Sequence, residues 1–174
     1  SITDELEWNY KKGQIIVKTQ KTRALIGFSN NEELVNGPLK MKISKAYTVT
    51  GFSSIDDKPL NESSKILLTL AGRDRNSGQT LDVLMQGDKK VEGDECFKMG
   101  EVGTAPLIFE PVEIEFSLKT AKNGKWKITP VDITGASVPE KAKEFLAENG
   151  QLKAKISNKE FASLNFIVEH IEQQ

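Results

Sequence analysis

The sequence predicts an all-β protein, an antiparallel β-sandwich of the jelly-roll or immunoglobulin-like type with one short helix. Two observations predict this class: short segments that alternate apolar and polar residues recur along the chain with turn residues between them, and only one segment has a helical pattern. No arrangement of parallel strands joined by helices is indicated. A small barrel is the alternative architecture.

The first two strands are expected to form a hairpin near the start of the chain. Leu6, Trp8 and Tyr10 alternate with polar residues, residues 11–13 (KKG) supply a turn, and the β-prone residues 15–17 follow. Because Trp8 has the same parity as Leu6, its ring is expected to face the core. Further strands are expected at residues 24–28, 39–43, 47–53 and 66–70, the last a nearly continuous apolar run typical of a central strand covered on both faces.

The clearest alternation lies in the second half of the chain, over residues 112–119 (VEIEFSLK). Asn123-Gly124 is a strong hairpin signal, and it predicts that the chain returns as a paired strand over residues 125–129. Trp126 shares parity with Ile128, so it is also expected to face the core. Two more strands are expected, over residues 152–156 and 164–168.

A single helix is expected over residues 137–149. Ser137 and Glu140 match a capping box, Pro139 falls in the first turn, and Gly150 follows the last residue. Ala142, Phe145 and Leu146 would then form one apolar stripe.

Composition limits the class of protein. The chain has 174 residues, of which 37% are hydrophobic and 28% charged, which predicts one module over residues 1–174. The net charge of −1 comes from scattered acidic and basic residues, so nucleic acid is not an expected partner. No segment is apolar over the length of a bilayer, and a membrane is not an expected partner either. The start at Ser1 shows neither an initiator Met nor a signal peptide, so we expect a piece excised from a longer protein.

Catalytic and metal-binding patterns are sparse. One histidine, His170, and one cysteine, Cys96, support neither a Ser-His-acid triad nor a zinc site. Glu113 and Glu115 could serve as paired carboxylates, but they fall on the polar side of an alternating strand, where a solvated surface is favoured. The module itself is therefore expected not to be an enzyme.

An acidic stretch over residues 88–95 is the one candidate for a metal. Hard cations such as calcium bind several oxygen ligands on a flexible loop, but this stretch lacks the ligand spacing of an EF-hand. A solvated loop is favoured, calcium is the alternative, and no other cofactor is expected. The candidate ligands are Asp88, Glu92, Asp94 and Glu95.

A cluster of charge follows the apolar strand at residues 66–70. Arg73, Asp74 and Arg75 would lie at the rim of the sandwich, where a guanidinium can pair with a carboxylate such as Glu110. A structural ion pair is favoured, and contact with a neighbouring domain or with a sugar is the alternative. Carbohydrate sites on β-sandwiches also use exposed aromatic rings, and Tyr10, beside a turn, is the best placed. The candidates for sugar binding are Tyr10, Trp126, Trp8, Arg73 and Arg75.

Several turn and strand motifs occur in an order that spans nearly the whole chain. They are Trp8 in the first hairpin, Gly27-Phe28, Ser54-Ile55-Asp56-Asp57-Lys58-Pro59, Arg73 with Asn76-Ser77-Gly78, and Ala105-Pro106 with Glu110. In this order they resemble the β-sandwich domain that follows the (β/α)-barrel in large secreted bacterial glycoside hydrolases. The chain departs from that pattern at Gln79-Thr80-Leu81, where an aromatic residue is missing, and at the helix expected over residues 138–149.

The resemblance implies a non-catalytic accessory module, because the catalytic acid and nucleophile of these enzymes lie in the barrel. It also implies a secreted, extracellular location. The expected partners are the catalytic barrel domain of the same chain and a polysaccharide or oligosaccharide. A cell-surface adhesion or protein-interaction module, unrelated to carbohydrate degradation, is the alternative.

Overall fold

The computed structural model describes residues 3–29, 31–44, 47–83, 85–86, 89–90 and 97–172. Its contacts divide the chain into two compact units. The first unit combines Ser1–Gly72 with Pro111–Gln174, and the second is Arg73–Glu110. The prediction of a single module over residues 1–174 stays a prediction.

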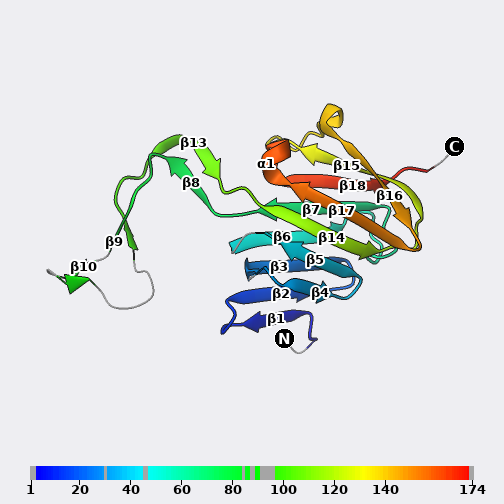
Figure 1. Ribbon diagram of the computed structural model, residues 1–174, viewed down its shortest axis with the longest axis horizontal. Helices are drawn as coiled ribbons and strands as arrows, with labels where there is room; N and C mark the ends of the chain where they lie inside the picture. The colour runs from blue at the N-terminus through cyan, green and yellow to red at the C-terminus, as the bar shows by residue number, and fades with distance from the viewer. Residues whose placement is uncertain are drawn as a thin grey trace. The chain divides into compact units, whose positions relative to one another are not determined.

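The first unit is a 12-stranded antiparallel sheet with the order β1-β2-β3-β6-β7-β18-β15-β16-β17-β14-β5-β4 (Figure 1). The predicted all-β antiparallel fold is confirmed. Helical turns are limited to the 3₁₀ turn η1 (Pro139–Lys141) and the four-residue α1 (Asn158–Phe161) among the described residues of this unit. The strands are β1 (Leu6–Asn9), β2 (Gln14–Lys18), β3 (Thr22–Phe28), β4 (Glu33–Asn36), β5 (Leu39–Ile43), β6 (Tyr47–Ser54), β7 (Lys65–Ala71), β14 (Glu113–Lys119), β15 (Gly124–Val131), β16 (Lys143–Glu148), β17 (Gln151–Ser157) and β18 (Asn165–His170).

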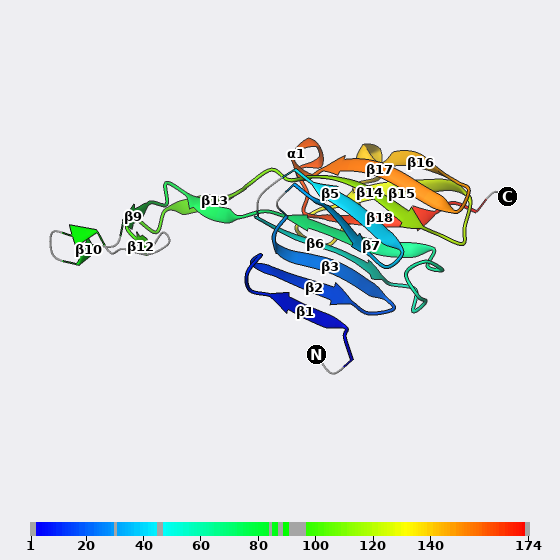
Figure 2. The same cartoon turned by 60° about the horizontal axis from the view of Figure 1, so that its bottom comes forward.

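The sheet curls over its own hydrophobic core. Phe52 on β6 and Phe116 on β14 are far apart in the strand order, yet their ring centroids are only 4.9 Å apart, at an interplanar angle of 66°. Between the last strand at one end and the second strand from the other, the Asn36 side chain on β4 donates a hydrogen bond of 2.9 Å to the Val17 carbonyl on β2. Figure 2 shows β5, β14 and β17 lying over β3, β6 and β7. The inner faces therefore enclose one core, which every strand except the edge strand β1 reaches by alternation of its side chains.

Most of the predicted strands are confirmed. The pattern over residues 113–119 places Ile114, Phe116 and Leu118 in the core and leaves the intervening side chains at the surface. The strand at residues 66–70 is central, between β6 and β18, as predicted. Its second face is only half-buried, at Leu67 and Thr69, so the prediction that both faces are covered is wrong for that face.

The helix predicted over residues 137–149 is wrong. Residues 143–148 form β16, in which Ala147 points to the core and Leu146 to solvent. Asn149 and Gly150 have positive φ angles, 51° and 71°, and they join β16 to β17 as a two-residue hairpin turn. What resembled a glycine at the end of a helix is therefore a hairpin signal.

The hairpin predicted at Asn123-Gly124 is also wrong. β14 pairs with β5 and β17, whereas β15 pairs with β16 and β18, so the two strands are not partners. Asn123 instead links the segment between β14 and β15 to other parts of the unit. Its Oδ1 accepts a hydrogen bond of 2.9 Å from the Gly150 N–H, and its carbonyl lies 2.9 Å from the His170 Nε2.

The second unit is a two-stranded ribbon. β8 (Asp74–Ser77) pairs with β13 (Thr104–Phe109), and β9 (Leu81–Val83) pairs with β12 (Phe97–Met99), beyond which β10 (Met85–Gln86) pairs with β11 (Lys89–Lys90). All six residues of β13 are exposed, although Leu107, Ile108 and Phe109 are apolar. The ribbon, called the arm below, has no hydrophobic core of its own among its described residues.

Replacing residues 74–109 by a short Gly-Ser turn is expected to leave the first unit folded. Every residue of the hydrophobic core belongs to the first unit, and a shorter connection costs less loop entropy. We expect the free energy of unfolding to change by less than about 1 kcal/mol. Urea denaturation followed by circular dichroism tests this, and a shortened protein that fails to unfold cooperatively would contradict it.

Candidate functional site

The outer surface of β1, β2, β3 and β6 is apolar over two adjacent rows of residues. The first row pairs Trp8 with Ile15, Ile15 with Ile26, and Ile26 with Val49, and the second pairs Leu6 with Val17. Because alternate residues of β2, β3 and β6 enter the core, the side that carries these rows faces outward. We call this surface the apolar face, and it consists of Leu6, Trp8, Ile15, Val17, Ile26, Phe28, Tyr47 and Val49.

Aromatic rings gather at one end of the apolar face. Trp8 is 74% exposed and Phe28 is 46% exposed. Phe28 meets the Tyr47 ring edge-to-face, with centroids 5.6 Å apart. The Phe28 ring also lies against Gly13, where a Cβ would come within 2.8 Å of a ring carbon, so this position must remain glycine to keep the ring in place. Tyr10, in the β1–β2 turn, is 75% exposed.

The structure corrects the prediction for Trp8 and agrees with the prediction for Tyr10. Parity alone led us to expect Trp8 in the core with Leu6. Both side chains do share a face, but it is the outer face, because β1 is the edge strand and all four of its residues lie outside the core. Tyr10 is exposed, as its place beside a turn predicted.

Trp126 faces the core, as its parity predicted, and this removes it from the candidate sugar-binding residues. Its side chain is fully buried, and its Nε1–H donates a hydrogen bond of 3.3 Å to the Lys122 carbonyl. The ring also packs edge-to-face on His170, with centroids 5.4 Å apart. No part of the indole is accessible to a ligand.

The predicted ion pair of Arg73 is confirmed. Its Nε and one terminal nitrogen contact the two carboxylate oxygens of Glu110 at 3.2 and 3.4 Å. The Glu110 N–H donates to the Arg73 carbonyl at 2.8 Å, so the pair closes the base of the arm. Arg75 lies on β8 within the arm and is exposed. Arg73 and Arg75 belong to the second unit, whereas the residues of the apolar face all belong to the first.

The candidate calcium ligands lie outside the described residues. This applies to Asp88, Glu92, Asp94 and Glu95, and also to Cys96. Among the residues that the structure does describe, no group of three His, Cys, Asp or Glu side chains could hold a metal ion.

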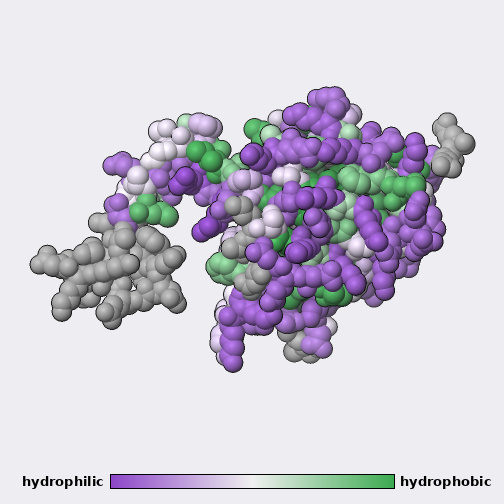
Figure 3. Space-filling model, in the orientation of Figure 1, coloured by the Kyte–Doolittle hydropathy of each residue, from purple (hydrophilic) through white to green (hydrophobic). Residues whose placement is uncertain are grey.

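The outer surface of β5, β14 and β17 differs from the apolar face. Figure 3 views the molecule from the side of these strands, and the surface there is mainly hydrophilic. Lysine and glutamate side chains cover it, among them Lys42, Glu115 and Lys155. The two sides of the curled sheet are thus suited to different kinds of contact.

Comparisons with protein-family models, with curated proteins and with solved structures find no match to this chain. No helix in the described part of the chain is long and apolar enough to cross a membrane.

Sequence reasoning found Trp8, and Tyr10 in the adjoining turn, as candidates but missed the aliphatic members of the apolar face. Ile15, Ile26 and Val49 lie in strands that it predicted, and their alternation is visible in the sequence. Alternation shows that one side of these strands is apolar, but it does not show whether that side is covered by another part of the fold or faces solvent.

Proposed function

We propose that this chain is a non-catalytic accessory module of a secreted polysaccharide-degrading glycoside hydrolase and that it binds polysaccharide at the aromatic end of the apolar face. The observation that carries the proposal is the exposure of Trp8 and Tyr10, each by about three quarters, on one hairpin. The motif order described above supports the enzyme class.

The aromatic end has the chemistry that sugars require. An exposed indole or phenol ring offers an apolar surface to the C–H face of a pyranose, while its polar tip stays in water. Polar groups lie beside the rings. Asn9 Oδ1 accepts a hydrogen bond of 3.1 Å from the Lys12 N–H, and the Lys12 ammonium pairs with Glu32 at 3.3 Å. The turn is therefore held in one shape, which reduces the entropy lost on binding.

A second candidate function is docking on a protein, either the catalytic barrel domain of the same chain or a cell-surface partner. The aliphatic part of the apolar face favours it, since Ile15, Ile26 and Val49 offer no polar group to a sugar. The exposed apolar residues of β13 favour it as well. Large exposed apolar surfaces commonly mark protein contacts.

Affinity electrophoresis against soluble neutral and acidic polysaccharides tests the proposal. We expect at least one polysaccharide to retard the protein, and a Trp8→Ala/Tyr10→Ala variant to bind it more than about tenfold more weakly, because two stacking rings are lost. The matched control is Ile133→Ala/Leu146→Ala, which removes two exposed apolar side chains elsewhere. It should bind like the unmodified protein.

Retardation by no polysaccharide would overturn the proposal and leave docking on a protein as the function of the apolar face. Equal retardation of the Trp8→Ala/Tyr10→Ala variant would overturn the assigned site. Loss of folding does not complicate either result, since both rings are largely exposed and their removal costs little stability.

A further inference from the structure

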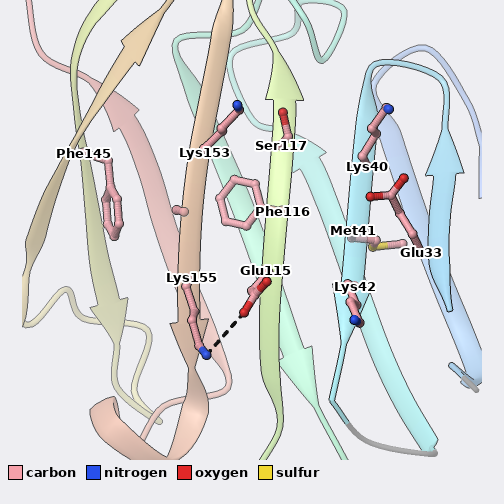
Figure 4. A pocket seen from close by; sticks show the side chains of 11 residues that line it. Glu33, Lys40, Met41, Lys42, Glu115, Phe116, Ser117, Phe145, Lys153 and Lys155 are labelled. Carbon is pink, nitrogen blue, oxygen red and sulfur yellow. Dashed lines mark ion pairs between the residues drawn. The ribbon is translucent and has the colours of Figure 1, made fainter. Parts of the chain in front are cut away.

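A shallow groove of about 480 Å³ crosses the outer surface of β4, β5, β14 and β17, away from the apolar face. Figure 4 shows its side chains. Four lysines line it, Lys40 and Lys42 from β5 and Lys153 and Lys155 from β17, against two glutamates, Glu33 and Glu115. The groove is therefore a basic surface on a chain whose net charge is −1.

One row of residues across this groove is neutralised. Strand pairing sets Lys42 opposite Glu115 and Glu115 opposite Lys155. The Lys155 ammonium lies 3.3 Å from Glu115 and 2.8 Å from Glu113. Hydrogen bonds to Glu113 and Glu115 raise the pKa of Lys155, so this lysine is fully charged and already has partners.

The next row on the same strands lacks a carboxylate at its centre. Here the pairing is Lys40 opposite Ser117 and Ser117 opposite Lys153. Within the described part of the chain, neither of these lysines lies within 4 Å of a carboxylate. Lys119, two residues beyond Ser117 on the same side of β14, adds a third exposed ammonium. The row thus leaves positive charge around a hydroxyl without a protein counterion.

The spacing of this row suits an anionic group. Neighbouring strands lie about 4.8 Å apart, so the backbones of Lys40 and Lys153 are separated by about 10 Å, with Ser117 midway. Two flexible lysine side chains can converge over that distance on one anion, and the hydroxyl can donate a third hydrogen bond. The half-buried Phe145 ring at the β16 side of the groove adds an apolar contact.

We propose that the Lys40–Ser117–Lys153 row binds the carboxylate or sulfate groups of an acidic polysaccharide. This inference rests on the proposed function and gives it a substrate class. The groove is open and lined by separate lysines, each of which binds one anion weakly, so the fitting ligand repeats its negative charge along a chain and gains affinity from several contacts at once. No arginine is among the residues that line the groove, so each anionic group would be held by lysine ammonium groups as point charges.

The test is affinity electrophoresis against polygalacturonate, dextran sulfate and neutral dextran, with a DNA duplex as a further polyanion. We expect retardation by polygalacturonate or dextran sulfate, weakening steeply as salt is raised, and none by neutral dextran. The result for the two acidic polymers distinguishes carboxylate from sulfate as the ligand.

Two variants locate the site. Ser117→Glu places a carboxylate between the two lysines, as Glu115 does in the neighbouring row, and it is expected to weaken binding at least about tenfold while the midpoint of thermal unfolding stays the same or rises. Lys40→Gln/Lys153→Gln should weaken binding similarly. The control is Lys65→Gln/Lys127→Gln, which removes the same charge from β7 and β15 and should bind normally.

Binding to neither acidic polymer would overturn the inference, as would equal binding by Ser117→Glu, or binding to DNA in preference to both. The Trp8→Ala/Tyr10→Ala variant separates this result from the proposed function. If that variant keeps its affinity for the acidic polymer while Ser117→Glu loses it, the groove is the site and the aromatic assignment fails. If both variants bind as well as the unmodified protein, the groove assignment fails.

Discussion

Replacing Trp126 by alanine is expected to lower the free energy of unfolding by about 3–5 kcal/mol. The indole is fully buried among core residues, and its removal leaves a cavity as well as an unpaired Lys122 carbonyl. The edge-to-face contact with His170 is lost too. Urea denaturation followed by circular dichroism measures the effect, since the method does not depend on tryptophan fluorescence.

Trp8→Ala provides the matched comparison for this prediction. It removes the same side chain from a position that is 74% exposed, so it is expected to cost less than about 1 kcal/mol. Equal losses for the two variants would contradict the assignment of Trp126 to the core and Trp8 to the surface. A stable Trp126→Ala protein with weakened sugar binding would contradict it as well.

The strands were predictable because their alternation of apolar and polar residues can be read from neighbouring positions in the sequence. Residues 113–119 alternate strictly, and any packing that buries one side of them produces the pattern seen in β14. The helix failed for a related reason. Residues 137–149 contain cap-like residues at helical spacing, but pairing with β15 and β17 fixes residues 143–148 as a strand, and local propensity is overridden by that pairing.

The sequence showed which dipeptides favour a turn, but it did not show which of these turns joins two paired strands. Asn123-Gly124 and Asn149-Gly150 are the same dipeptide, and only the second joins paired neighbours. The difference is the partner of each strand, which depends on contacts between residues far apart in the chain. Prediction of the candidate site from the sequence is limited in the same way, because it too depends on which strands are neighbours. Alternation placed Trp8 and Leu6 on one side, and only the strand order showed that this side faces outward.

The basic groove was outside the reach of sequence reasoning for a further reason. Lys40, Ser117 and Lys153 are separated by 77 and 36 residues in the sequence, and only the register of three strands makes them neighbours. A scattered distribution of charge along a chain therefore does not mean a scattered distribution on its surface.

Asp56 is expected to make the stability of the first unit depend on pH below about pH 4. Its carboxylate accepts hydrogen bonds from the Ser54, Ser63 and Ser64 hydroxyls at 2.9, 2.6 and 2.9 Å and from the Ser64 N–H at 2.8 Å. Partial burial acts to raise the pKa of Asp56, but these hydrogen bonds outweigh burial and hold the pKa well below its ordinary value. The carboxylate thus fastens the turn between β6 and β7 only while it is ionised.

The sign of the pH dependence follows from the lowered pKa of Asp56. A group with a lower pKa in the folded than in the unfolded state stabilises the fold above its unfolded pKa, and this contribution is lost as the pH falls toward the folded value.

Asp56→Asn is therefore expected to cost about 1–3 kcal/mol at neutral pH and progressively less as the pH falls below about 4. Urea denaturation of both proteins at several pH values measures the difference. Asp57→Asn, at an exposed neighbour that pairs with Lys21, is the control and should change little. A cost for Asp56→Asn that stays constant down to low pH would show that the carboxylate is not the stabilising group, because a purely steric effect has no reason to follow its titration.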